Sequence, residues 1–139
     1  MEVTIRRLDR NILFEAASDS GNTIRMDGAA AGGGSGKGFR PMELLLAGIG
    51  GCSAFDVVEL LREAGQDLQD LAITVSGERA ADRTPAVFTT VHLAYTLVGT
   101  IDPAAAEHAL EVGIKQQCSV GEMLGRTAEI TYSYRIESP

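Results

Sequence analysis

The chain has 139 residues and a mass of 14.7 kDa, so we expect a single domain over residues 1–139. Its 45% of hydrophobic and 22% of charged residues are typical of a soluble protein with a core. The formal net charge of −7 argues against a nucleic-acid-binding protein, which would carry a basic excess. Because no stretch resembles a transmembrane segment or a signal peptide, we expect a cytoplasmic protein with no membrane partner.

The N-terminal segment is predicted to be a three-stranded antiparallel meander. Apolar residues alternate with polar ones around two turns, as in half-buried strands. The apolar positions are Val3, Ile5, Leu8, Ile12, Phe14 and Ala16, and a third short strand is expected over Thr23–Met26. Residues 27–40 that follow are rich in glycine and predict a flexible connector. A phosphate-binding loop is disfavoured, since Ala31 and Gly38 stand where that motif needs Gly and Ser or Thr.

Residues 41–64 are predicted to form the longest helix. Pro41 suits its first position and Gly65 its C-terminal cap. Three glycines inside it, Gly48, Gly50 and Gly51, cost about 1 kcal/mol each relative to alanine. Because only packing compensates that cost, we infer a buried central helix in tight contact with a second element or with its own copy in a dimer.

The rest of the chain alternates strands and helices without regular βαβ units. Strands are expected over residues 68–80, 87–98 and 129–136, a helix from Pro103 to about Gln117, and a short helix over residues 120–124. Asp102 is the candidate N-cap of the helix that begins at Pro103. The order β-β-β-α-β-β-α-α-β predicts an α+β fold.

The two cysteines are the only candidates for chemistry, although buried small hydrophobes are the plainer interpretation of both. Cys52 shares a helix face with Asp56 and Glu59, whose charges disfavour a thiolate, so a reactive Cys52 needs a nearby cation. Cys118 precedes a short helix that Ser119 is predicted to cap, a better place for a thiolate.

No other catalytic or metal set is legible. His92 and His108 are predicted to be ordinary surface or core residues, and two distant cysteines with two distant histidines make a poor zinc site. We therefore expect no metal and no bound cofactor.

The segment Pro41–Ser53, with Glu43-Leu44 near its start and Gly50-Gly51-Cys52 near its end, resembles the signature helix of the OsmC/Ohr family. That family comprises osmotically inducible and organic hydroperoxide resistance proteins. The resemblance extends over nearly the whole chain, since a second cysteine, Cys118, opens a short helix before the last strand. It implies an α+β, intertwined homodimer whose long Cys-bearing helices are central, with active sites near the dimer interface.

The resemblance also implies an activity, a thiol peroxidase that reduces organic hydroperoxides in oxidative-stress defence. Cys52 would be the peroxidatic thiol, which becomes a sulfenic acid, and Cys118 the resolving thiol, which condenses with it to a disulfide. An external dithiol reductant, of the lipoyl type in the best-known branch, would restore the thiols. Ser119 follows Cys118 where the family usually has proline.

The family uses an arginine to favour the thiolate and a glutamate to hold that arginine. The position of the arginine differs between branches, and Arg25, Arg10 and Arg40 are the candidates here. Glu43 is the candidate glutamate, although the best-studied branches place it one residue earlier, where this chain has Met42. The alternative interpretation is a stress or ligand-binding protein of the same fold with weak or no peroxidase activity.

Overall fold

The strands and helices follow one another in the predicted order over residues 1–139, all of which the computed structural model describes. The first part holds β1 (Val3–Arg7), β2 (Phe14–Ser18), β3 (Thr23–Met26) and a 3-10 turn, η1 (Ala30–Gly32). The second part holds α1 (Pro41–Glu63), β4 (Asp67–Arg79), β5 (Phe88–Thr100), α2 (Pro103–Val112), η2 (Gly113–Gln117), α3 (Ser119–Leu124) and β6 (Glu129–Glu137). The α+β class is confirmed, and the chain divides into two units, Met1–Leu45 and Leu46–Pro139.

The N-terminal unit, Met1–Leu45, is built on the predicted meander. The strands β1, β2 and β3 pair antiparallel, with Ile5 opposite Ala16 and Ala16 opposite Ile24. Apolar side chains of this small sheet remain open, since Ile5 is 60% exposed and Val3 57%. Its own residues therefore do not cover the sheet.

The glycine-rich segment of this unit takes a defined path around Asp27. The Asp27 carboxylate accepts hydrogen bonds from the hydroxyl of Ser35 (2.7 Å) and from the backbone amides of Gly28, Ser35 and Lys37 (2.8–3.1 Å). The Ser35 hydroxyl, followed by the Lys37 amide, lowers the Asp27 pKa from 3.8 to about 2. One carboxylate thus holds this segment in a defined conformation, whereas its sequence predicts a flexible connector.

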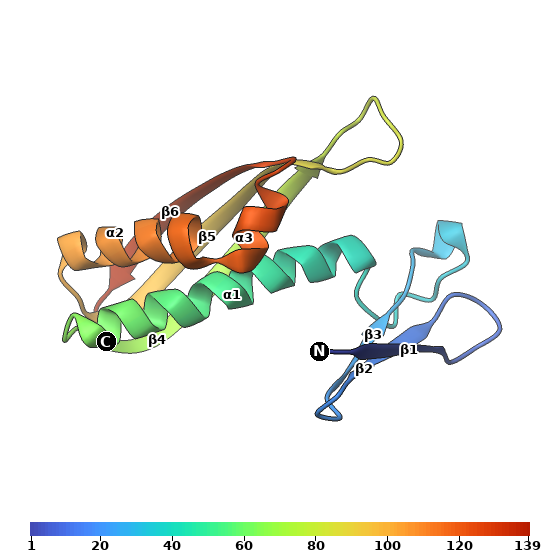
Figure 1. Ribbon diagram of the computed structural model, residues 1–139, viewed down its shortest axis with the longest axis horizontal. Coiled ribbons are helices and arrows are strands. Elements are labelled where there is room, and N and C mark those ends of the chain that lie inside the picture. The colour runs from blue at the N-terminus through green and yellow to red at the C-terminus, as the bar shows by residue number, and fades with distance from the viewer. The chain divides into compact units, whose positions relative to one another are not determined.

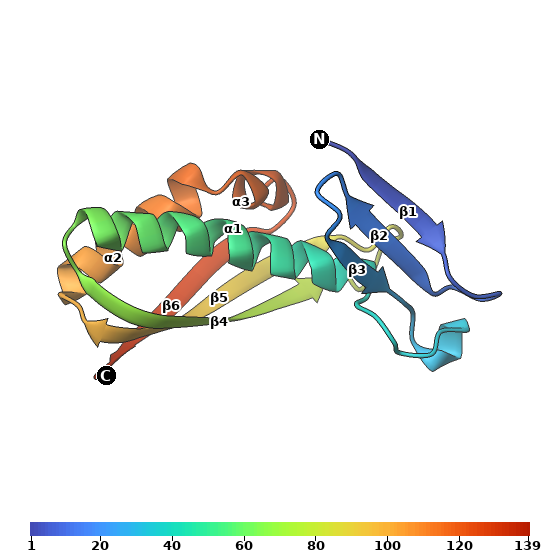
Figure 2. The ribbon, with the colours of Figure 1, turned by 90° about the horizontal axis from the view of Figure 1, so that it is seen from below.

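The C-terminal unit, Leu46–Pro139, places helices on one face of a three-stranded sheet (Figures 1 and 2). The strand β5 is central, antiparallel to β4 and parallel to β6. A parallel partner requires a crossover, which α2, η2 and α3 supply. The core lies between the sheet and helices α1 and α2, and its fully buried side chains include Ile49, Val57, Leu61, Leu93, Leu97 and Leu110.

The helix boundaries follow local chemistry. Asp102 caps α2 as predicted, accepting hydrogen bonds from the amides of Ala104 (2.9 Å) and Ala105 (3.1 Å). The prediction that this helix runs regularly to Gln117 is wrong, because it ends at Val112 and continues as the π-helical turn η2. The wider turn places the amide of Cys118 3.1 Å from the carbonyl of Gly113, five residues back.

One helix has the length and composition of a membrane span, which we did not expect from the sequence. Helix α1 is long enough to cross a bilayer and reaches a mean hydropathy of 1.8. Ile49, Val57 and Leu61 of this helix are fully buried in the core of the C-terminal unit, and 28% of the apolar window is buried within the chain. The core helix of a soluble protein passes the same test.

Candidate active site

The two cysteines lie in the C-terminal unit and both are free thiols. Cys52 is on the middle of α1 and is half-buried, whereas Cys118 directly precedes α3 and is only 3% exposed. A small molecule from solution therefore meets Cys52 more readily than Cys118.

The Cys118 thiol connects α3 with α1. Its sulfur accepts a hydrogen bond from the amide of Gly121 at 3.2 Å, and it lies 4.0 Å from the Ile49 carbonyl, toward which the thiol donates. Cys118 is thus the N-cap of α3, and the prediction that Ser119 caps this helix is wrong. Helix α3 begins one residue earlier than predicted, at Ser119, so the capping position falls on Cys118.

The surroundings of Cys118 favour its protonated form. Burial raises the pKa of this thiol to about 11, against the opposing effect of the Gly121 amide. Cys52 raises it further, both as a hydrogen-bonding partner and through its charge. We expected the helix terminus to favour a thiolate, but burial has the larger effect on the pKa of this thiol. The influence of Cys52 on the Cys118 pKa indicates that the two thiols lie near each other.

Small residues allow this close approach of helices. A Cβ atom on Gly113 would lie 3.0 Å from Cγ2 of Val57 and 3.3 Å from its backbone nitrogen, so η2 rests directly on α1. A Cβ on Gly121 would lie 3.3 Å from the Cys118 sulfur. On α1, a Cβ at Gly50 would lie 3.0 Å from a methyl group of Val75, as the glycines predicted, whereas Gly51 has no such neighbour within 4 Å.

A buried hydroxyl pair lies near the thiols. The hydroxyl groups of Tyr95, on β5, and Ser53, on α1, are 2.6 Å apart, and these residues are 2% and 0% exposed. Burial, together with the nearby Cys118, Asp56 and Cys52, raises the Tyr95 pKa to about 12, which keeps its hydroxyl protonated at neutral pH. Sequence reasoning missed this pair. The available signals were the inward position of Tyr95 in an alternating strand and the place of Ser53 directly after Cys52.

The candidate glutamate and arginines belong to the N-terminal unit. Glu43 accepts a hydrogen bond from the Arg40 backbone amide (2.9 Å) and thereby caps the start of α1. Arg25 lies 4.0 Å from the Glu15 carboxylate, and Arg10 is exposed in the turn between β1 and β2. In the C-terminal unit, no basic side chain is among the groups that shift the Cys118 pKa.

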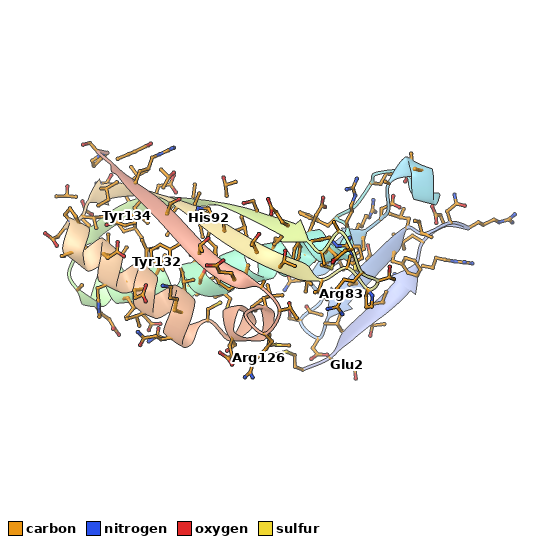
Figure 3. All side chains as sticks on the ribbon, turned by 90° about the horizontal axis from the view of Figure 1, so that it is seen from above. Glu2, Arg83, His92, Arg126, Tyr132 and Tyr134 are labelled. Carbon is orange, nitrogen blue, oxygen red and sulfur yellow. The ribbon has the colours of Figure 1, made fainter.

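The histidines do not join the cysteines. His92 stands on the sheet face opposite the helices, where its ring nitrogens pair with the hydroxyls of Thr131 (2.7 Å) and Ser133 (2.9 Å) (Figure 3). His108 is exposed on α2. No group of three or more histidine, cysteine or carboxylate side chains is arranged to hold a metal ion.

An open groove of about 660 Å³ lies between α1 and β4. Phe55, Val58, Leu68 and Leu71 form its apolar part, with Arg62 and Asp70 among its polar lining residues. Neither cysteine lines it. Phe55 is 77% exposed, so this groove leaves apolar surface of α1 uncovered.

Three comparisons place this arrangement among known proteins. The model of the family described as "OsmC-like protein" matches residues 34–133. Protein YhfA of Escherichia coli strain K12 is 35% identical over 126 residues, which cover 90% of each chain. A hypothetical protein from Aquifex aeolicus VF5 has a similar crystal structure, with a TM-score of 0.84, 28% identity and coverage of 99% of this chain and 96% of that one. The organic hydroperoxide resistance protein OhrB of Bacillus subtilis shares the fold at a TM-score of 0.68 and 20% identity, with 96% of both chains covered.

Proposed function

The chain belongs to the OsmC-like protein family, and from this premise and its paired thiols we propose that it is a cysteine-based peroxidase that reduces organic hydroperoxides. The single observation that carries the proposal is the adjacency of a half-buried Cys52 and a buried Cys118, both free. The fold shared with an organic hydroperoxide resistance protein supports the choice of substrate class. We further propose a cytoplasmic role in oxidative-stress defence.

The proposed reaction begins at Cys52, the more accessible thiol. Its thiolate attacks one oxygen of the hydroperoxide, the O–O bond breaks, and the departing alkoxide takes a proton to leave as an alcohol. Cys52 is oxidised to a sulfenic acid. The sulfur of Cys118 then attacks the sulfenic sulfur, a disulfide forms, and the Cys118 proton leaves with the hydroxide as water. An external dithiol reduces the disulfide and is itself oxidised to a disulfide.

The different surroundings of the two thiols support this division of roles. Cys118 is buried and its pKa is raised to about 11, so it stays a thiol until Cys52 has been oxidised. A thiol in contact with the sulfenic acid limits further oxidation of Cys52, because condensation competes with attack by a second peroxide. We assign Cys52 as the peroxidatic residue and Cys118 as the resolving residue.

A reactive Cys52 requires a cation, because Asp56 and Glu59 share its helix face. We propose that an arginine of the N-terminal unit supplies it, with Arg25 as the first candidate and Arg10 and Arg40 as the others. The bond between Glu43 and the Arg40 amide supports a capping role for Glu43 beside any contact with that arginine. Replacing each arginine by glutamine removes its charge. Measuring the rate at which iodoacetamide alkylates Cys52 in each variant would identify the residue, since only one replacement is expected to slow this reaction.

We propose that the protein acts as an intertwined homodimer. Apolar side chains of both units are uncovered, including Ile5 at 60% exposure, Phe55 at 77% and Met123 at 74%. Within the N-terminal unit, Ile5 lines one apolar groove together with Ile12, Phe14 and Met26. Contiguous exposed apolar surface of this kind marks an interaction site in soluble proteins. Light scattering is expected to give the mass of two chains, and a stable folded monomer would contradict the proposal.

The experiment that tests the activity counts free thiols after one equivalent of organic hydroperoxide is added to the reduced protein, in parallel with hydrogen peroxide. We expect rapid loss of both thiols, faster with the organic substrate and reversed by dihydrolipoamide. The Cys52→Ser variant should lose turnover completely, whereas Cys118→Ser should stop at a sulfenic acid that dimedone labels. Undiminished turnover in Cys52→Ser would overturn the proposal.

A second candidate function is supported by Asp56, which shares the helix face of Cys52 and whose charge raises the Tyr95 pKa. A carboxylate there disfavours a thiolate, as expected for a ligand-binding protein of this fold without rapid catalysis. In that case both thiols would stay free for many minutes in the presence of the hydroperoxide. The same thiol count therefore decides between the two functions.

A further inference from the structure

The hydroxyl pair near the thiols has a defined direction. Ser53 carries one hydroxyl proton, and its oxygen lies 2.8 Å from the Ile49 carbonyl, closer than the 3.2 Å to the Gly50 carbonyl. Because that proton is used on the helix backbone, the Tyr95 hydroxyl donates to Ser53 across the 2.6 Å contact. The order of donation is therefore Tyr95 to Ser53 to the Ile49 carbonyl.

The same carbonyl is also approached by the resolving thiol. The Cys118 sulfur lies 4.0 Å from the Ile49 oxygen, so strand β5 and the start of α3 meet at one turn of α1. That turn leads directly into Cys52, the residue before Ser53. Since Ser53 and Tyr95 are 0% and 2% exposed, water cannot replace a bond that is lost there.

We propose that Tyr95 is a positioning residue of the thiol pair: through Ser53 it fixes the turn of α1 whose Ile49 carbonyl receives Cys118, and so holds Cys118 within reach of Cys52. Tyr95 touches neither the peroxide nor the reacting oxygen. Its role in catalysis rests on the proposed peroxidase function, because a resolving thiol is needed only when Cys52 becomes oxidised. The geometry of the pair can nevertheless be measured without any peroxide.

The measurement is the equilibrium between the Cys52–Cys118 thiol pair and glutathione, in which the protein dithiol and one glutathione disulfide exchange for the protein disulfide and two glutathione thiols. Its constant reports the effective concentration of one thiol at the other. Removing one buried hydrogen bond in Tyr95→Phe should lower this constant about three- to tenfold. The Ser53→Ala variant, which interrupts the same chain, should lower it by a similar factor.

Two comparisons separate positioning from general stability. The double variant Tyr95→Phe/Ser53→Ala should fall no further than either single variant, because both act on one chain of bonds. Tyr132→Phe is the matched control, since that tyrosine also loses hydrogen bonds, to Glu107 (2.7 Å) and Glu111 (2.9 Å), outside the thiol pair. It should leave the glutathione equilibrium unchanged.

A wild-type equilibrium constant in Tyr95→Phe and Ser53→Ala, with only the unfolding free energy reduced, would overturn the positioning role. Should Tyr95→Phe fail to fold, Ser53→Ala alone decides, because an unchanged constant there also overturns it. Failure of the wild-type pair to form a disulfide in oxidised glutathione would overturn it as well. If instead organic hydroperoxides leave Cys52 reduced while the glutathione equilibrium still depends on Tyr95, the peroxidase function fails and the positioning role stands.

Discussion

The two units of this chain differ in how far they bury their apolar side chains. In Met1–Leu45, the only side chains buried within the chain are those of Ala16 and Asp27, and the sheet leaves Ile5 60% exposed. In Leu46–Pro139, the helices cover the sheet, and Leu93 and Leu97 on its central strand are fully buried. The comparison teaches that the thiols belong to the unit with its own core, while the other unit leaves its apolar side chains largely uncovered.

The largest effect is expected from a cavity in the C-terminal core. Leu97→Ala should lower the free energy of unfolding by about 2–5 kcal/mol, because Leu97 is 0% exposed and its neighbours cannot fill the space. Urea denaturation measures this loss. Ile24→Ala, in the 38% exposed position of β3, is the companion variant and should cost about 1 kcal/mol or less. Equal losses of unfolding free energy at the two sites would contradict the difference between the units.

The next effect concerns the partner surface of the N-terminal sheet. If a second copy covers Ile5, then Ile5→Ser should weaken dimerisation at least about tenfold, since burial of one isoleucine contributes about 1.5–3 kcal/mol. Sedimentation equilibrium over a range of protein concentrations measures the dissociation constant. Thr4→Ser, on the opposite face of β1, is the control and should change it little. An unaltered dimer in Ile5→Ser would place the interface elsewhere.

A smaller, pH-dependent effect is expected in the loop around Asp27. Its pKa is lowered from 3.8 to about 2 in the folded protein, first by the Ser35 hydroxyl, so the ionised carboxylate stabilises the fold. This stabilisation is fully present above about pH 4 and is lost as the pH falls toward 2. The protection of the Ser35 and Lys37 amides against hydrogen exchange, relative to the intrinsic exchange rate at each pH, should therefore fall over this interval.

Asp27→Asn provides the control for the loop. An amide side chain keeps the shape but removes the titrating group, so exchange at Ser35 and Lys37 should be faster at neutral pH and should lose the acid transition. Protection in this variant equal to that of the wild type would show that the loop is held by other contacts.

The smallest effect is expected from charge beside Cys52. The i, i+4 spacing brings Asp56 to about 6 Å from Cys52, where a unit charge is worth about 0.7 kcal/mol in water. Asp56→Asn should therefore raise the rate with a hydroperoxide that carries a carboxylate about threefold relative to a neutral alkyl hydroperoxide. The ratio of second-order rate constants is the measurement. Glu59→Gln, an exposed position on the same helix face, should change the ratio less.

Local signals predicted much of the fold. Asp102 and Pro103 determined where α2 begins, and the glycines of α1 correctly predicted a close neighbour, which for Gly50 is Val75. The sequence alone identified Cys52 and Cys118 as the candidate reactive residues. The sequence did not reveal that α3 would begin at Ser119, because a shift of one residue there moves the cap to Cys118.

The missing parts depend on contacts between distant segments. No sequence periodicity predicts that Tyr95 contacts Ser53, because this hydrogen bond joins a strand and a helix that are distant in the sequence. The high pKa of Cys118 was missed for the same reason, because its first cause is burial by elements that sequence spacing does not locate. Proximity to a helix terminus was a poor guide when burial opposed it.

The parallel pairing of β5 with β6 has a consequence for the order in which the chain folds. Cys118 lies in the crossover between these strands, so its position depends on a loop that is closed only when β6 adds to the sheet. Contacts of this kind carry a high entropic cost and tend to form late. A nascent chain that has made α1 and the β4–β5 hairpin therefore presents Cys52 without its neighbour. The proposed disulfide between the two sulfurs is therefore expected only after folding is complete, and its rate of formation in a refolding chain should follow the docking of the final strand.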